Sequence, residues 1–326
     1  MKITLDATLF ANPPSAIQLS AIAGYALDGR HRIHISDEGH PDFLNWLAGR
    51  TAQEREEWEL LLGFGAALDA REPARREVHI VAGGAQNWGQ NPPAIGIDVA
   101  LGVLSRPFRI YLENGMNDKA FILGVASDEY RKRLLKLEND GFLEFANGGG
   151  ITTLLQQIQP IVNPRGVDWH RTATLIDSDA LQPGAPSHQS LAVLNFCAQH
   201  SLWCHQLQRR SIENYLPREI LRGWAYTGKA PQKRKVFEAF VGMSSSQREH
   251  YNMKTGFQGD EDRQGPNCGT LYHNIVGATR ASLMNGFGSH IAKLYSSEAI
   301  SQDHLRRDGS ENELRSLVTE ILAMAR

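Results

Sequence analysis

The sequence predicts an α/β fold in which a mainly parallel sheet is flanked by helices and followed by a helical C-terminal region. Short apolar runs of strand length alternate with segments of helical periodicity through much of the 326 residues. Connections long enough to hold a helix favour parallel pairing of the strands that they join. The strand pattern fades after Gly223, so we expect the remainder of the chain to be mostly helical.

The expected strands are rich in β-branched and aromatic residues and are bounded by turn residues. The run 78–82, for example, ends at Gly83-Gly84, and the run 108–112 ends at Glu113-Asn114-Gly115. Strands are expected at 32–35, 78–82, 108–112, 142–145, 173–176 and 202–206.

Helical periodicity and end signals mark the segments between these strands. Ser15 is the expected N-cap of a helix over 15–27, and a run of acidic residues opens a helix over 51–68. Further helices are expected at 94–104, 118–125, 128–137, 151–158, 191–198, 212–221, 236–241 and 311–325. The segment 254–269 is rich in Gly, Asp, Gln and Asn, which predicts a loop.

The chain divides into three expected regions: an α/β region at 1–105, a core at 106–260 and a mostly helical region at 261–326. Residues 1–100 carry 8 Lys and Arg against 13 Asp and Glu, a net charge of −5, and no chemistry-bearing motif. We therefore expect the first region to serve regulation or assembly by docking a partner or a second copy of the chain. Trp46 and Trp58 can anchor such a contact or belong to the core.

Composition argues against several classes of protein. The 3 cysteines lack a Cys-x-x-Cys pair, which argues against a disulfide framework and a structural zinc site. No apolar signal core follows Met1 and no run reaches the length of a membrane span, so we expect a cytoplasmic protein. The overall charge of −2 gives no global basic field, but residues 205–254 carry 10 basic against 4 acidic residues, a net of +6.

Carboxylates gather where expected strands end, as in the sites of open α/β sheets. Glu113 follows one strand, with Asp118 five residues later, and Asp177 and Asp179 follow another. Side chains at i and i+2 of an extended segment leave it on one face. Crowded carboxylates repel one another unless a cation holds them, and oxygen ligands favour Mg²⁺ or Mn²⁺. The alternatives are a solvated strand end at Glu113, a helix N-cap at Asp118 and a simple turn at Asp177 and Asp179.

A further acid, Glu213, lies in the basic segment. Arg209 and Arg210 precede it and can clamp a phosphate beside a metal ligand, or form ion pairs with other residues. Lys254, on a glycine-rich loop, can stabilise charge developing on a phosphate or be solvated. The expected nucleic-acid contacts are Arg209, Arg210, Lys233, Arg234 and Lys235.

A glycine run, Gly148-Gly149-Gly150, leads into an expected helix. Its backbone N–H groups can hold a phosphate, although close packing of a helix on a sheet explains the glycines equally well. The run matches neither the Gly-x-Gly-x-x-Gly fingerprint nor a Walker A motif. The histidines show no zinc-ligand spacing, and the chain has no Gly-x-Ser-x-Gly elbow.

The order of these motifs resembles the TOPRIM domain, which has a Rossmann-like core, and in particular the OLD-type nucleases of bacterial phage defence. Glu113 with Gly115 and Asp118 is similar to the family's first acidic motif, although the family's Asp lies four residues after the Glu. The other similar segments are Asp177-Ser178-Asp179, Arg210-Ser211-Ile212-Glu213-Asn214-Tyr215 and Met253-Lys254-Thr255-Gly256, and the likeness covers about 105–260.

This resemblance implies metal-dependent phosphodiester cleavage, often under the control of an ATPase partner, in an anti-phage defence system. It implies that one or two Mg²⁺ or Mn²⁺ ions are held by Glu113, Asp118, Asp177, Asp179 and Glu213. Lys254 is then the expected contact to the scissile phosphate, and the substrate can be DNA or RNA. Two alternatives stay open: a non-catalytic nucleic-acid-binding or assembly subunit with a degenerate metal site, and a small-molecule enzyme that binds a nucleotide at Gly148–Gly150.

Overall fold

The computed structural model describes residues 1–84, 86–163, 165–228, 230–263 and 270–325, and it contains two four-stranded parallel sheets. The predicted α/β class is confirmed, with the strands divided between both sheets. The first sheet has the order β2-β1-β3-β4 and consists of β1 (Lys2–Leu5), β2 (Arg32–Ile35), β3 (Glu77–Ile80) and β4 (Ala94–Ile95). The second has the order β6-β5-β7-β8 and consists of β5 (Phe108–Leu112), β6 (Leu143–Asn147), β7 (Thr172–Ile176) and β8 (Trp203–Gln206).

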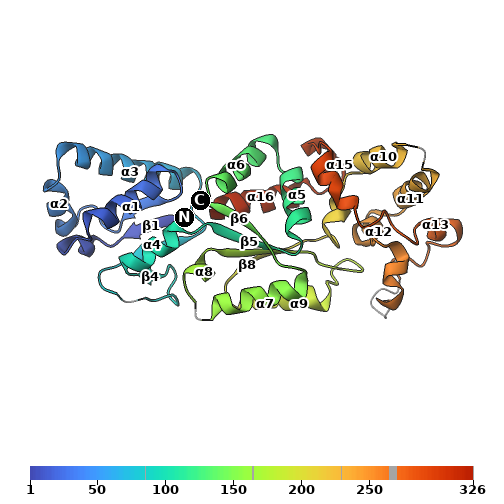
Figure 1. The fold of residues 1–326 in the computed structure, drawn as a ribbon, viewed down its shortest axis with the longest axis horizontal. Coiled ribbons are helices and arrows are strands. Elements are labelled where there is room, and N and C mark those ends of the chain that lie inside the picture. The colour runs from blue at the N-terminus through green and yellow to red at the C-terminus, as the bar shows by residue number, and fades with distance from the viewer. Residues whose placement is uncertain (85, 164, 229, 264–269, 326) are drawn as a thin grey trace.

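Helices cover both sheets (Figure 1). The first sheet is accompanied by η1 (Ala7–Ala11), α1 (Ala16–Leu27), α2 (Pro41–Ala48), α3 (Ala52–Arg71) and α4 (Ile97–Ser105). The second is accompanied by α5 (Gly115–Val125), α6 (Asp128–Asn139), α7 (Ile151–Val162), α8 (Val167–His170) and α9 (His188–Gln199). Apolar residues of α5 and α6 pack in one core on the second sheet, whereas those of α7 and α9 pack in another.

After Gln206 the described part of the chain contains helices and turns but no strand. The elements are η2 (Ile212–Tyr215), α10 (Arg218–Tyr226), α11 (Pro231–Val241), α12 (Ser245–His250), η3 (Gly256–Arg263), α13 (Gly277–Ser282), η4 (Ile291–Lys293), α14 (Leu294–Ser297), α15 (Gln302–Arg307) and α16 (Glu311–Ala325). The expected loop at 254–269 therefore includes a 3-10 helix, and its last part, 264–269, lies outside the described residues. Among the described helices, none has the length and apolar composition to cross a bilayer.

The two tryptophans of the first region are core residues. Trp46 and Trp58 are 9% and 8% exposed, and their rings meet edge to face with centroids 5.3 Å apart. Phe10 packs on Trp46 with a centroid distance of 4.6 Å. These contacts favour the core alternative over a role for the tryptophans in docking a partner.

The two sheets meet at the amino ends of their strands. Arg30, just before β2, donates to the carbonyl of Gly141 at 3.2 Å, close to the start of β6. Arg76, just before β3, donates to the carbonyl of Thr172, the first residue of β7, at 3.0 Å. The carboxyl ends of the two sheets consequently point away from each other, and those of the second sheet point toward the side of the molecule that carries α10, α11, α12 and α13 (Figure 1).

Candidate active site

A pocket of about 290 Å³ opens at the carboxyl ends of β5, β6 and β7. β5 lies between β6 and β7, so the chain order reverses beside it, and such a reversal is where open α/β sheets bind ligands. Its lining consists of Glu113, Asn114, Asn117, Asp118, Asn147, Gly149, Gly150, Asp177, Ile212, Glu213 and Lys254. Four of the five predicted metal ligands and the predicted lysine therefore share one pocket, whereas Asp179 is not part of its lining.

The turn after β5 places Glu113 and Asp118 in this pocket. Asn114 is the N-cap of α5, because its side chain accepts from the Asn117 N–H at 3.3 Å. Asp118 lies one turn into the helix, and its Oδ2 accepts from the Asn114 N–H at 2.8 Å. Asp118 is 5% exposed, so it is neither the N-cap nor a solvated helix residue. Helix geometry thus brings its carboxylate back toward the strand end that carries Glu113.

The segment after β7 carries the two predicted aspartates. Asp177 lines the pocket, and its Oδ1 accepts from the Ile212 N–H at 3.1 Å. Asp179 has a φ of 50°, and its N–H donates to the Arg210 carbonyl at 2.8 Å. The left-handed backbone at Asp179 ends the extended path there, yet Asp179 stays near the pocket, because its charge is the largest of those that raise the pKa of Glu113.

Glu213 and Lys254 form an ion pair at the pocket. Glu213, from η2, is 0% exposed, and its Oε1 lies 3.1 Å from the Lys254 Nζ. Lys254 follows α12, and its side chain is 45% exposed. Burial disfavours the charged amine, but the negative charges of Glu213 and Asp177 outweigh burial and raise the pKa of Lys254. The pocket therefore contains a cation that stays charged at neutral pH.

Three acids of the pocket, Glu113, Asp118 and Asp177, have raised pKa values. Burial, followed by the charges of Asp179 and Asp118, raises the pKa of Glu113 to about 7. Burial also raises the pKa of Asp118 to about 7, with a contribution from the charge of Glu213. The pKa of Asp177 lies well above its ordinary value because of burial and of the charge of Glu113. Perturbed acids in one cleft are typical of functional sites.

The predicted glycine run forms one wall of the pocket. Gly149 and Gly150 have φ values of 70° and 94°, which glycine adopts without strain. No side chain caps the amino end of α7 at Gly150. Because the first N–H groups of a helix lack intrahelical partners, this end of α7 can receive an anion in the pocket. A Cβ on Gly148 would come within 2.7 Å of the Leu112 carbonyl, so packing explains that glycine.

The carboxylates of the pocket are suitable ligands for a hard divalent cation, although their oxygens are not close enough together to coordinate one ion as they stand. Within the described ranges, no group of three His, Cys, Asp or Glu side chains is placed to hold a metal ion. Glu113 Oε2 and Glu213 Oε2 are nevertheless buried oxygens that accept no hydrogen bond from the described residues. Carboxylate oxygens are preferred ligands of Mg²⁺, so the donor set fits such an ion if the side chains move closer.

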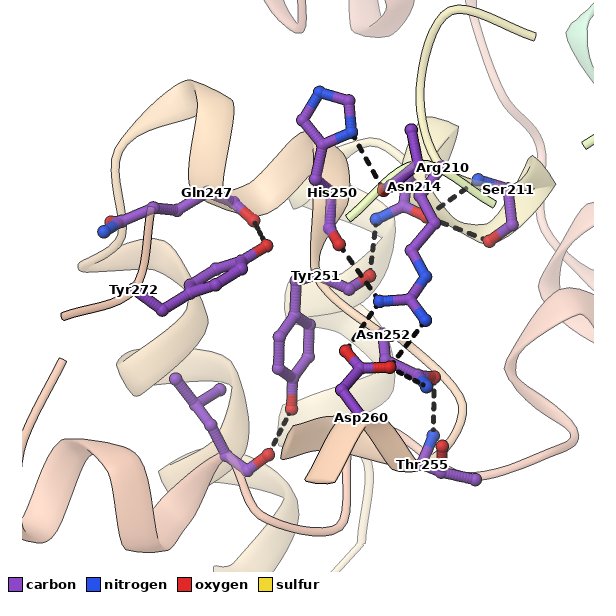
Figure 2. Close-up of polar contacts among 12 residues, drawn as sticks. Arg210, Ser211, Asn214, Gln247, His250, Tyr251, Asn252, Thr255, Asp260 and Tyr272 are labelled. Atoms are coloured by element: carbon purple, nitrogen blue, oxygen red, sulfur yellow. Dashed lines mark hydrogen bonds and ion pairs between the residues drawn. The ribbon is translucent and has the colours of Figure 1, made fainter. Parts of the chain in front are cut away.

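Arg209 and Arg210 do not form the expected nucleic-acid surface. Arg209 is 7% exposed and donates to Asp308 Oδ2 at 2.5 Å. Arg210 is 5% exposed and binds both oxygens of Asp260 at 2.7 Å (Figure 2). Asn252, which also bonds Asp260, connects this pair to the segment that carries Lys254 (Figure 2). Burial and pairing indicate a structural role for both arginines, and Arg210 holds the segment that carries Lys254 through Asp260 and Asn252.

The other predicted basic residues lie on the surface of α11. Arg234 and Lys235 are exposed, and Lys233 is half-buried. Asn114, Asn117 and Asn147, which also line the pocket, were missed as site residues. The position of Asn147 at a strand end before the glycine run was the available signal, whereas Asn117 has no motif of its own.

The chain matches no family model, and no curated protein or solved structure is significantly similar to it.

Proposed function

We propose that this protein is a divalent-metal-dependent nuclease that hydrolyses phosphodiester bonds in DNA or RNA. The observation that carries the proposal is the pocket shared by Glu113, Asp118, Asp177, Glu213 and Lys254 at the strand ends. Gathering four acids in one pocket, with Asp118 and Glu213 buried, is costly unless a cation compensates their charge. A pocket that combines such acids with a lysine and an open helix amino end suits a phosphate ester.

The roles of the residues follow from their places in the pocket. Glu113, Asp118 and Asp177 would hold Mg²⁺ or Mn²⁺, which when bound activates water and neutralises charge on a phosphate. Glu213 orients Lys254 through their 3.1 Å ion pair. Lys254 stabilises negative charge on the phosphate oxygens, and the amino end of α7 binds the same group. Asp179 acts through its charge, which raises the pKa of Glu113.

The likeness of the motifs to OLD-type nucleases supports a role as the effector of an anti-phage defence system. It also supports an ATPase partner that controls cleavage. Residues 1–105 form a hydrophobic core of their own, apart from the residues of the pocket. That region is our proposed docking site for the ATPase or for a second copy of the chain.

The test is cleavage of supercoiled plasmid and of structured RNA with Mg²⁺, Mn²⁺ or EDTA. We expect cleavage only with metal, and its loss in Asp177→Asn and Lys254→Met. Asp128→Asn is the matched control, because the Asp128 side chain is 88% exposed and is not part of the pocket lining. Folded protein that cleaves neither substrate would contradict the proposal and favour the non-catalytic subunit. Cleavage that Asp177→Asn retains would contradict the assignment of this site.

A further inference from the structure

The helix pair α10–α11 carries four cations that have no acidic partner. These side chains are Arg222, Lys233, Arg234 and Lys235, and within the described part of the chain none lies within ion-pairing distance of a carboxylate. Arg209 and Arg210, from the same basic segment, are by contrast buried and paired with acids. The helix pair also carries Glu238, which accepts from the Tyr226 hydroxyl at 3.1 Å, so the four unpaired cations leave α10–α11 with a net positive charge.

Two aromatic rings lie among these cations. Tyr226 is 45% exposed, and the guanidinium carbons of Arg234 and Arg222 lie 5.0 Å and 6.0 Å from its ring centroid. The Lys233 Nζ lies 4.6 Å from the ring centroid of Trp224, which is half-buried. An exposed ring beside unpaired cations is the arrangement that single-strand binding proteins use, with bases stacked on rings and phosphates on cations.

We propose that this face, the α10–α11 platform of Arg222, Trp224, Tyr226, Lys233 and Arg234, binds single-stranded nucleic acid. The proposal deepens the nuclease function and rests on it for the identity of the substrate. A single strand offers unstacked bases to Tyr226, whereas a duplex keeps its base faces covered. The cations contact the backbone of either form, so the aromatic ring provides the preference for single strands.

The α10–α11 platform is connected to Lys254 by a ring contact and backbone hydrogen bonds. Trp224 packs on Phe287 with a centroid distance of 5.4 Å. The Phe287 N–H donates to the Met253 carbonyl at 2.7 Å, and the Gly288 N–H donates to the Lys254 carbonyl at 3.1 Å. The helix pair thus packs against the backbone that presents Lys254. A nucleic-acid strand bound to the platform is therefore bound to helices that pack against the segment carrying Lys254.

Fluorescence anisotropy in EDTA tests the platform without cleavage, using a labelled oligothymidine and a duplex of equal length. We expect the intact protein to bind the single strand more tightly. Tyr226→Ala should weaken that binding about tenfold, the loss of roughly one stacked base, whereas Tyr226→Phe should not. The double variant Arg222→Gln/Arg234→Gln should lower the slope of log affinity against log salt by about 1.4 units, or about 0.7 for each cation removed. Arg306→Gln removes an exposed charge on α15 that is already ion-paired, so it is the matched control.

The outcomes separate this inference from the nuclease function. Equal affinity for both forms, or unchanged binding by folded Tyr226→Ala, would overturn the platform even if cleavage occurs. Single-strand binding that depends on Tyr226, in a protein that cleaves nothing with any metal, would support the platform and contradict the nuclease. Circular dichroism of each variant confirms that it is folded before affinities are compared.

Discussion

Replacing Glu113 with Gln should stabilise the metal-free protein, and this stabilisation should increase as the pH rises. The substitution removes the charge but keeps the size of the side chain. One Glu113 oxygen, Oε2, accepts no hydrogen bond from the described residues, so a Gln amide placed there displaces no donor. Its N–H groups can donate to the neighbouring carboxylates, whose charges act on Glu113.

The magnitude follows from the raised pKa of Glu113. Its pKa rises from 4.5 in the unfolded chain to about 7 in the folded protein. Below the lower value both states bind the proton, and between the two values the folded state binds more protons. The stability of the intact protein therefore falls as the pH rises through this window, by about 3 kcal/mol at roughly 1.4 kcal/mol per pKa unit. The variant has no titratable group at this position, so its free energy of unfolding does not fall for this reason.

Thermal melting in EDTA from about pH 4.5 to about pH 8.5 measures the effect. We expect similar melting temperatures at the acidic end and a variant about 5–10 °C more stable at the alkaline end. Mg²⁺ should stabilise the intact protein most above about pH 7, where Glu113 is ionised. It should therefore reduce the difference in melting temperature between the variant and the intact protein. Glu129→Gln, at a side chain that is 78% exposed, is the control. A difference between variant and intact protein that does not change with pH would refute the crowded-acid interpretation.

Two further pairs of variants test the packing around the site. Arg210→Met leaves Asp260 buried without its cation and should lower the free energy of unfolding by about 3–5 kcal/mol, whereas Lys235→Met on the surface should change it by less than about 0.5 kcal/mol. Urea unfolding measures both, and similar small losses would show that the buried pair is not structural. Gly148→Ala places a Cβ 2.7 Å from a backbone oxygen and should destabilise by about 1–3 kcal/mol, whereas Gly63→Ala in α3 meets nothing within 4 Å and should stabilise by about 0.5–1 kcal/mol. Thermal melting compares the two glycine variants. A melting temperature that is higher for Gly148→Ala than for Gly63→Ala would contradict the packing argument.

Local signals predicted several elements with their observed bounds. The strands at 32–35 and 108–112 and the last helix, 311–325, were all predicted from periodicity and turn residues. The strand β1 was missed, although it pairs with both β2 and β3 at the centre of its sheet. Pairing with these two strands, which are distant in sequence, stabilises the four residues of β1 as a strand. The expected helix at 212–221 is interrupted at Pro217, because proline lacks the N–H that a continuing helix requires.

The sequence by itself determined which carboxylates follow the strands, because alternating apolar and polar runs fix where a strand ends. It predicted Glu113, Asp177 and Glu213 as candidates, and the topology brought them together by placing β5 beside β7. That Asp177 lines the pocket and Asp179 does not could not be predicted from the Asp-x-Asp pattern.

Only the tertiary structure decided which basic residues are available to a substrate. Arg209 finds Asp308 across 99 positions of sequence, and Arg210 finds Asp260 across 50. The charge of a segment indicates neither partner, because an ion pair depends on which distant side chain folding brings within reach. Burial then makes the pairing obligatory, since an unpaired guanidinium in the interior is far more costly than one in water. The same folding left Lys233, Arg234 and Lys235 of α11 without an ion-pair partner among the described residues.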